Sequence, residues 1–224
     1  MVIKQNGYDV EYSEKIDDTE HYYEVLDRLE CDATIEGKIH NQETKYRMIL
    51  QDLSLEELWQ LFPIVLEPHN PEWKNWYEDA RKKLLQVIPA SALAAIHHIG
   101  STAVPGIWAK PIVDILVELK PTSDMDAVAT KIEDSGWFRM SSNERRISLN
   151  KGYTPEGYAE RVYHLHLRYE GDNAEVAFAE YLRQHPDVAK EYEALKLSLW
   201  HKYEHDRDGY TEAKTAFITK HRIL

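Results

Sequence analysis

Cysteine and long apolar runs are both scarce in this chain. Its 224 residues include one cysteine, Cys31, so no disulfide can form within the chain. No apolar run approaches the ~20 residues that a membrane-spanning helix needs. The first ten residues also lack the apolar core of a signal peptide. These absences exclude a fold held by internal disulfides and predict a chain without a membrane segment, with the cytoplasm as its expected location.

Basic residues are outnumbered by acidic ones, 27 to 39, which gives a formal net charge of -12. The lysines and arginines are scattered along the chain, so electrostatic repulsion disfavours non-specific binding to nucleic acid or anionic lipid. A local basic pocket for a nucleotide is still compatible with this charge. Hydrophobic residues make up 43% of the chain, which is enough to fill a core at this length.

The first part of the chain differs from the rest in charge. Residues 1–47 hold twelve acidic and six basic residues, which is half of the net charge of the whole chain. Alternating and helically spaced apolar residues within this segment indicate a small hairpin and a helix. We therefore predict an acidic extension over residues 1–50, available to a partner protein, and a main domain over residues 51–224.

The main domain shows strand and helix patterns in mixed order. Strands are expected at 93–99, 112–119, 137–140, 146–149 and 162–169. Helices are expected after a capping box at Ser54 and Glu57, after Asn70–Pro71, and after a cap at Ser123 with Asp126, with three more from Asn173 onward. The near-continuous Ile, Val and Leu run at 112–119 predicts a central strand. The pattern predicts an α+β fold: a mixed sheet flanked by helices and followed by a helical cap.

A Gly-Ser turn lies between the first two expected strands. Gly100 lets the backbone approach a ligand closely, Ser101 offers a hydroxyl and an amide to a phosphate oxygen, and Asp114 can hold a divalent cation. Two-metal nucleotidyl transfer needs carboxylates that share ions ~4 Å apart, commonly at positions i and i+2 of one strand. Here position i+2 is Leu116, and Glu118 lies ~13 Å along the strand. The acidic pair is therefore incomplete.

Histidines supply candidate partners for Asp114. His164 and His166 alternate with apolar residues, so they project from one strand face ~7 Å apart. Paired imidazoles bind a metal, contact a phosphate or move a proton; the alternative is a hydrogen-bonded sheet face without function. His97 and His98 point to opposite faces of their strand, and we expect His98 to face the site because it shares a face with Gly100.

Cationic side chains gather in the second half of the chain. Lys110 precedes the Asp114 strand, where its ammonium can neutralise a phosphate. Arg207, Tyr210 and Lys214 share one helix face at i, i+3 and i+7, and Lys196 lies on the preceding helix. This face is either a clamp that closes a triphosphate against the sheet or an ordinary solvated helix face.

Several of these motifs resemble those of the GrpB family. That family shows a His-Ile-Gly-Ser-Thr-Ala turn, a Lys-Pro-Ile-Val-Asp-Ile-Leu-Val strand, a His-Leu-His strand and a Tyr-Leu-Arg-x-His-Pro helix start. The corresponding segments here are His98–Ala103, Lys110–Val117, His164–His166 and Tyr181–Pro186. The resemblance covers roughly residues 54–220. It implies membership of the nucleotidyltransferase superfamily and a polymerase-beta-like core that binds a metal nucleotide.

The residues and the resemblance together predict a nucleotidyltransferase that depends on Mg or Mn, uses a nucleoside triphosphate and acts on an unknown acceptor. The predicted catalytic and metal-binding residues are Asp114, His164 and His166. The predicted nucleotide-binding residues are His98, Gly100, Ser101, Thr102, Lys110, Lys196, Arg207, Tyr210 and Lys214. The alternative is a module that binds a nucleotide or a phosphorylated metabolite in a degenerate transferase site without turnover, and the missing second acid favours it.

Overall fold

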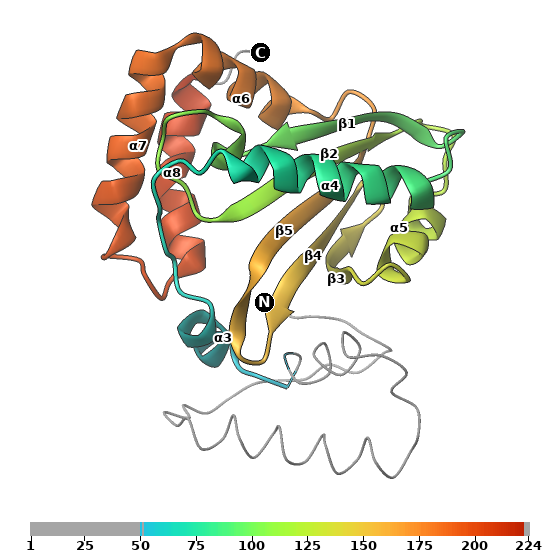
Figure 1. Ribbon diagram of the computed structural model, residues 1–224, viewed down its shortest axis with the longest axis horizontal. Helices are drawn as coiled ribbons and strands as arrows, with labels where there is room; N and C mark the ends of the chain where they lie inside the picture. Colours follow the sequence, from blue (N-terminus) through green and yellow to red (C-terminus); the bar gives the residue numbers. More distant parts are fainter. Residues whose placement is uncertain (1–49, 51, 222–224) are drawn as a thin grey trace. The chain divides into compact units, whose positions relative to one another are not determined.

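A computed structural model of the chain describes residue 50 and residues 52–221 (Figure 1). The described residues fall into two units divided between Leu61 and Phe62. The acidic extension predicted over residues 1–50 lies, except for residue 50, outside the described residues.

The last part of the first unit contains helix α3 (Leu55–Leu61), which begins with the expected capping box. The Glu57 amide donates to Ser54 Oγ at 3.2 Å, and the Ser54 amide donates to the Glu57 carboxylate at 2.7 Å. These two bonds satisfy amides that the first helical turn leaves without partners.

The second unit is built on a five-stranded sheet. Its strands are β1 (Leu93–Ile99), β2 (Ile112–Leu119), β3 (Phe138–Asn143), β4 (Arg146–Thr154) and β5 (Gly157–Tyr169). Its helices are α4 (Glu72–Val87), α5 (Met125–Glu133), α6 (Ala174–Gln184), α7 (Pro186–Trp200) and α8 (Arg207–His221), with a 3-10 turn at Ser101–Ala103. The strand order is β1-β2-β5-β4-β3; β2 and β5 are parallel, and the other pairs are antiparallel. This mixed sheet with its C-terminal helices confirms the predicted α+β class.

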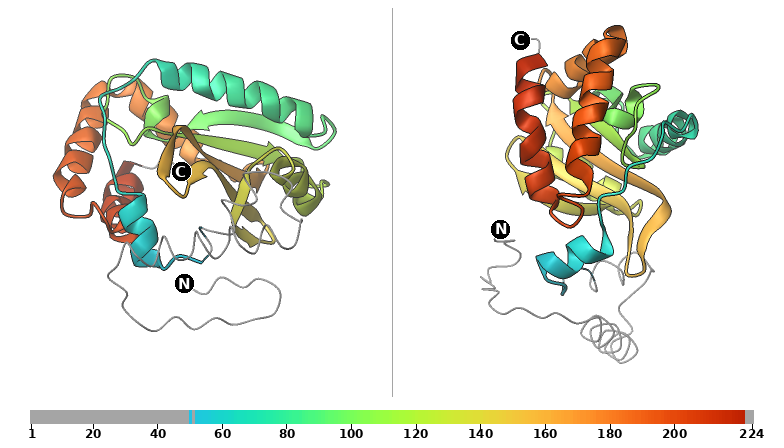
Figure 2. Two further views of the ribbon diagram at one scale, coloured as in Figure 1. Left: turned by 60° about the horizontal axis from the view of Figure 1, so that its bottom comes forward. Right: turned by 90° about the vertical axis from the view of Figure 1, so that its left-hand side faces the viewer.

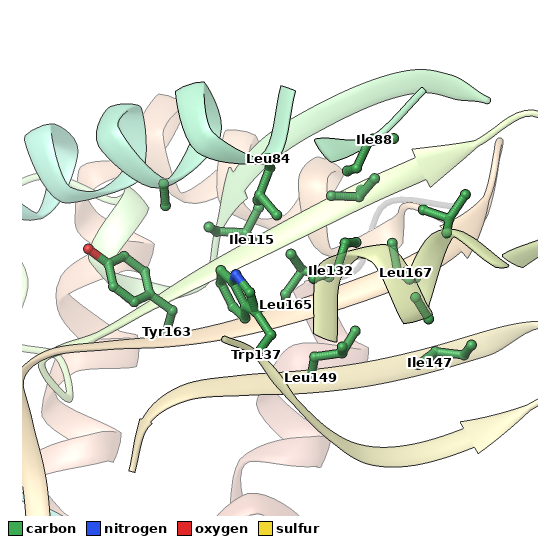
Figure 3. Close-up of a cluster of buried hydrophobic side chains, with 14 of the residues drawn as sticks. Leu84, Ile88, Ile115, Ile132, Trp137, Ile147, Leu149, Tyr163, Leu165 and Leu167 are labelled. Carbon is green, nitrogen blue, oxygen red and sulfur yellow. The ribbon is translucent and has the colours of Figure 1, made fainter. Parts of the chain in front are cut away.

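Helices cover both faces of the sheet. Helices α4 and α5 pack on one face, and α6, α7 and α8 lie on the opposite side (Figures 1 and 2). In the core under α4 and α5, Ile115 and Leu165 of the sheet meet Leu84 of α4 and Ile132 of α5 (Figure 3). Each of these side chains is at most 1% exposed, and burying one contributes about 1.5–3 kcal/mol. Because side chains alternate along a strand, the intervening residues of β2 and β5 face the C-terminal helices.

A second apolar cluster holds the C-terminal helices together. Val104 and Ile107, in the loop after β1, pack with Leu182 of α6 and with Val188 and Tyr192 of α7. This cluster fixes the loop between β1 and β2 against the helices. None of the described helices is long and apolar enough to cross a membrane.

The hairpin of β4 and β5 is longer than the sequence predicts. The expected strands ended at residue 149 and resumed at residue 162, whereas β4 runs to Thr154 and β5 starts at Gly157. The pairing register shifts between Lys151 and Tyr153, so a bulge interrupts the regular alternation of side chains. Gly152, within the bulge, has φ +89°, and a Cβ there would lie 2.2 Å from the Arg161 carbonyl oxygen.

The predicted cap of α5 is wrong by one residue. Asp124 is the cap, and its carboxylate accepts a hydrogen bond from the Ala127 amide at 3.0 Å. The Ser123 hydroxyl instead donates to the Ala92 carbonyl oxygen at 3.3 Å. A carboxylate at the N-cap is also stabilised by the positive end of the helix dipole.

Candidate functional site

A pocket of about 520 Å³ is lined by side chains from the sheet, from the Gly-Ser turn and from α6, α7 and α8. The predicted site residues that line it are Gly100, Ser101, Thr102, Lys110, Asp114, His164, His166, Lys196, Arg207, Tyr210 and Lys214. Residues nearly 120 positions apart in the sequence are thus brought to one cavity, and His98 is the predicted residue outside this set.

Asp114 lies where the Gly-Ser turn meets β2. The antiparallel register places Ile99, the last residue of β1, opposite Asp114, and the chain turns at the next residue. Gly100 has φ +71°, and a Cβ on it would lie 2.2 Å from Asp114 Oδ2. Only glycine combines this backbone conformation with such a close approach, so the turn is built to fit the carboxylate.

Asp114 and His164 converge from neighbouring strands. The parallel register of β2 and β5 pairs Asp114 with His164, and both side chains project toward the C-terminal helices. Asp114 Oδ1 lies 3.2 Å from His164 Nδ1 and 4.0 Å from His166 Nε2. The strand pattern predicted the shared face of the two histidines, and the sheet order supplies the carboxylate beside them.

The hydrogen bonds of His164 fix its tautomer. His164 Nε2 lies 3.1 Å from Arg207 Nη2 and 2.8 Å from the Tyr153 hydroxyl. A guanidinium only donates, so Nε2 must accept, and the proton of the neutral ring is on Nδ1, where it is donated to Asp114. Both ring nitrogens are therefore engaged, and His164 has no free lone pair for a metal ion unless Arg207 moves.

The charge states of this pair follow from burial and from neighbouring charges. Burial lowers the pKa of His164 to about 4, and the charges of Arg207 and Lys110 add to this effect against the opposing influence of Asp114. Burial alone would raise the pKa of Asp114, but the hydrogen bond from His164 and the charge of Lys110 outweigh it and lower that pKa. At neutral pH the pair is thus a carboxylate beside a neutral imidazole.

The donor set around Asp114 limits what kind of cation it could hold. Within residues 50 and 52–221, no group of three or more His, Cys, Asp or Glu side chains is arranged to hold a metal ion. Mg²⁺ commonly takes one or two carboxylates and completes its shell with phosphate oxygens and water. Asp114 could supply the carboxylate. His166 is the predicted second ligand, and its side chain makes no hydrogen bond to other described residues.

The expected orientation of His98 is wrong. The register places His98 opposite Ile115, on the face that α4 covers, where its ring stacks on Tyr77 at 4.8 Å. His98 Nε2 lies 3.0 Å from Thr102 Oγ1, which itself donates to the Ile112 carbonyl oxygen. The prediction assumed that strand alternation continues to Gly100, but the strand ends one residue earlier and the turn breaks the alternation.

Glu118 and His97 share a face with Asp114 but bind each other. His97 Nε2 lies 2.8 Å from Glu118 Oε2. The other carboxylate oxygen accepts from the Gly171 amide at 2.8 Å and from Asn173 Nδ2 at 3.1 Å. Glu118 therefore anchors the loop before α6 and does not complete an acidic pair with Asp114.

Cations surround the carboxylate. Lys214 Nζ lies 4.2 Å and Lys110 Nζ 5.6 Å from the centre of the Tyr210 ring, while Lys196 donates to the Trp108 carbonyl oxygen. Burial lowers the pKa of Lys110 and of Lys196 to about 7 and that of Lys214 to about 8, and repulsion from other cations adds to the shift. An anion in the pocket would reverse these shifts.

Tyr153 and Glu175 are among the polar groups at the site that the sequence did not predict. Tyr153, the donor to His164, follows the Gly152 bulge in a part of β4 that was not recognised as strand. Glu175, in the first turn of α6, lines the pocket and forms two hydrogen bonds of 2.7 Å with Arg168. The first-turn position of Glu175 was visible in the sequence, but its partner on β5 was not.

Comparisons with known proteins agree on one family. The model of the GrpB family, described as GrpB protein, matches residues 63–222. A glutamate-rich protein GrpB of Alkalihalophilus pseudofirmus is 33% identical over 164 residues, which cover 69% of this chain and 91% of that protein. A UPF0157 protein of Pseudomonas aeruginosa is 32% identical over 68% of this chain and 64% of its own length.

A solved structure agrees with these sequence matches. The crystal structure of a conserved protein GrpB from Enterococcus faecalis is similar with a TM-score of 0.60 and 31% identity. The match covers 70% of this chain and 94% of the chain from Enterococcus faecalis. The family match over residues 63–222 includes the sheet and the helices that form the pocket.

Proposed function

This chain belongs to the GrpB family, and we propose that its pocket binds a nucleoside triphosphate and transfers the nucleotidyl group to an acceptor, with a divalent cation on Asp114. One observation carries the proposal: besides the ion-paired Arg146 and Glu175, a single pocket holds Asp114 and four further cationic side chains. They are Lys110, Lys196, Arg207 and Lys214. Such an excess of buried positive charge is costly without an anion, and a triphosphate supplies several negative charges in one molecule.

Each residue has a defined task in this reaction. The lysines and Arg207 would hold the phosphate chain, and Asp114, oriented by the proton of His164, would share the cation with it. That cation would neutralise charge as the nucleotidyl group is transferred. The acceptor oxygen bonds to the α-phosphorus, the bond to the bridging oxygen breaks, and pyrophosphate leaves. Burial lowers the pKa of His166, so its neutral ring can take the proton of the acceptor.

The second candidate is a binding module without turnover. Two observations favour it: Leu116, fully buried, occupies the position where a second acid would stand, and both nitrogens of His164 are engaged in hydrogen bonds. In this case the same cations would hold a nucleotide or a phosphorylated metabolite as a signal. Metal would then be dispensable for binding.

The test is calorimetric titration with each nucleoside triphosphate, with and without Mg²⁺ or Mn²⁺, for the wild type and for Asp114→Asn. Asp79→Asn is the matched control because Asp79 is exposed on α4 and outside the pocket. We expect metal-dependent binding that Asp114→Asn abolishes and the control retains, with pyrophosphate released after cell extract is added. Tight binding that ignores metal and Asp114, without product, would support the binding module. No binding of any nucleoside triphosphate would overturn nucleotidyl transfer and leave a phosphorylated metabolite as the ligand of the second candidate.

A further inference from the structure

The hydroxyl of Tyr210 is buried without a hydrogen-bond partner among the described residues. Tyr210 lies in the first turn of α8, is 1% exposed and lines the pocket. Two other tyrosines of this unit have partners: the buried Tyr153 bonds to His164 at 2.8 Å, and the partly exposed Tyr158 donates to the Phe62 carbonyl oxygen at 3.3 Å. A phenylalanine would fill the same space as Tyr210 without the cost of an unsatisfied polar group. The hydroxyl therefore points to a partner from outside the chain.

Two cations approach the aromatic ring that carries this hydroxyl. Lys214 and Lys110 both approach the Tyr210 ring, and among the described residues neither side chain has an ion pair or a hydrogen bond. Arg207 lies one helical turn before Tyr210 on the same helix. This part of the pocket thus holds an O–H donor and two ammonium groups that make no ion pair, with Asp114 as the carboxylate whose charge acts on both lysines. Such a surface recognises an anion with several acceptor oxygens, of which a phosphoryl group is the common biological case.

We propose that the Tyr210 hydroxyl, Lys110 and Lys214 form a subsite for one phosphoryl group of the ligand. The inference rests on the proposed function, because it assigns one part of the same pocket. It does not depend on transfer, since a phosphoryl group would be held here whether or not the ligand reacts.

The course of α8 gives the orientation of the ligand. Tyr210, Lys214 and Ile218 follow at helical spacing and all line the pocket, and Tyr210 and Ile218 are ~12 Å apart along the axis. Ile218 packs with the apolar cluster that contains Leu182, and Phe178 packs against the same cluster. The subsite at Tyr210 would thus take a phosphoryl group, and the apolar end would take the organic part. The ligand class is a polyphosphate ester with an apolar or aromatic group, aligned along α8.

The test compares Tyr210→Phe with the wild type, using inorganic tripolyphosphate without metal as the probe. Thermal unfolding without ligand and calorimetric titration are measured on the full chain. Loss of an orphan hydroxyl should raise the melting temperature, while loss of its bond to a charged phosphoryl oxygen should weaken binding about tenfold. The matched control is Tyr169→Phe, because the Tyr169 hydroxyl donates to the Ser123 carbonyl oxygen at 3.3 Å, outside the pocket. It should lower the melting temperature and leave binding unchanged.

Three results would overturn the subsite: wild-type protein that ignores millimolar tripolyphosphate, Tyr210→Phe that binds it as tightly as the wild type, or Tyr210→Phe that loses thermal stability as the control does. If Tyr210→Phe fails to fold, Lys214→Gln is titrated instead and should weaken binding by a similar factor; unchanged binding would again overturn the proposal. Failure of nucleotidyl transfer is a separate result, because tripolyphosphate carries neither a nucleoside nor an acceptor.

Discussion

At the scale of single residues, His164 illustrates how position sets chemistry. An isolated histidine next to a carboxylate is a plausible metal ligand or base, but contact with an obligate donor such as Arg207 decides which nitrogen holds the proton. Here the ring links α8 to Asp114, because it bonds to Arg207 through one nitrogen and to Asp114 through the other. This assignment needs the tertiary structure, because Arg207 lies 43 residues further along the chain.

The buried lysines give a pH prediction. Because the pKa values of Lys110 and Lys196 are about 7 and that of Lys214 is about 8 without ligand, these groups lose their charge as the pH rises above 7. A bound polyphosphate favours the charged forms, so binding takes up protons and weakens with pH. From pH 7 to pH 9 we expect the affinity for tripolyphosphate to fall at least about tenfold.

Titration in buffers of different ionisation enthalpy measures this proton uptake directly.

The folding stability of the ligand-free protein should change with pH in the opposite direction to the affinity. Unfolded lysines titrate near 10.4, so the unfolded chain binds more protons between pH 7 and pH 9 and the folded state gains stability over that window. An affinity that is constant or rises from pH 7 to pH 9 would contradict the prediction.

At the scale of elements, the sequence best predicts those strands whose pattern of side chains stays regular along their length. The bounds of β2 match the expected 112–119, because a strand buried on both faces is a continuous apolar run. The bounds of β1 match the expected 93–99, although β1 is a partly exposed edge strand. The Tyr153 part of β4 escaped prediction because a bulge breaks its alternation. The choice between His97 and His98 needed the antiparallel register, which no local pattern supplies.

The bulge in the β4–β5 hairpin gives a prediction at this scale. Gly152→Ala combines a positive φ with a Cβ contact of 2.2 Å to a backbone oxygen, so we expect a loss of about 3 kcal/mol or more. Gly106→Ala is the control, since Gly106 has φ +79° but open space around its Cα, and should lose only about 1–2 kcal/mol. Urea unfolding measures both. Equal losses for the two variants would show that the close contact relaxes freely.

At the scale of the whole molecule, the pocket belongs to the second unit. Its lining residues all lie at Leu66 or beyond. The segment that follows Leu61 is tied to this unit: the Ile64 amide donates to the Glu204 carbonyl oxygen at 2.8 Å, and Glu67 and Ala109 exchange backbone hydrogen bonds. The division of the chain therefore falls before these contacts.

This division predicts how the chain tolerates truncation. A fragment of residues 62–224 should keep its melting temperature within a few degrees and should bind tripolyphosphate with an affinity within about twofold of the full chain. A fragment of residues 70–224 loses Ile64 and Leu66, each 2% exposed, and should be less stable by about 3 kcal/mol or more. Thermal unfolding and calorimetry of both fragments are the measurements. Loss of binding in the longer fragment would place part of the site before residue 62.

The net charge of -12 and the cationic pocket have to be considered together. We expect the overall negative field to repel polyanions such as nucleic acid, which need a wide basic surface. A small phosphate ester, if it enters the pocket as proposed, would meet the local cations at short range. Charge would then select for ligand size as well as ligand sign.

The positions of the pocket cations along the chain have a consequence for synthesis. The sheet is complete once β5 has been translated, but Arg207, Tyr210 and Lys214 leave the ribosome only with α8. A nascent chain can therefore place Asp114, Lys110 and Lys196 before Arg207, Tyr210 and Lys214 are available. If the pocket holds a phosphorylated ligand as proposed, a chain interrupted before α8 would hold that ligand less tightly than a chain that includes α8.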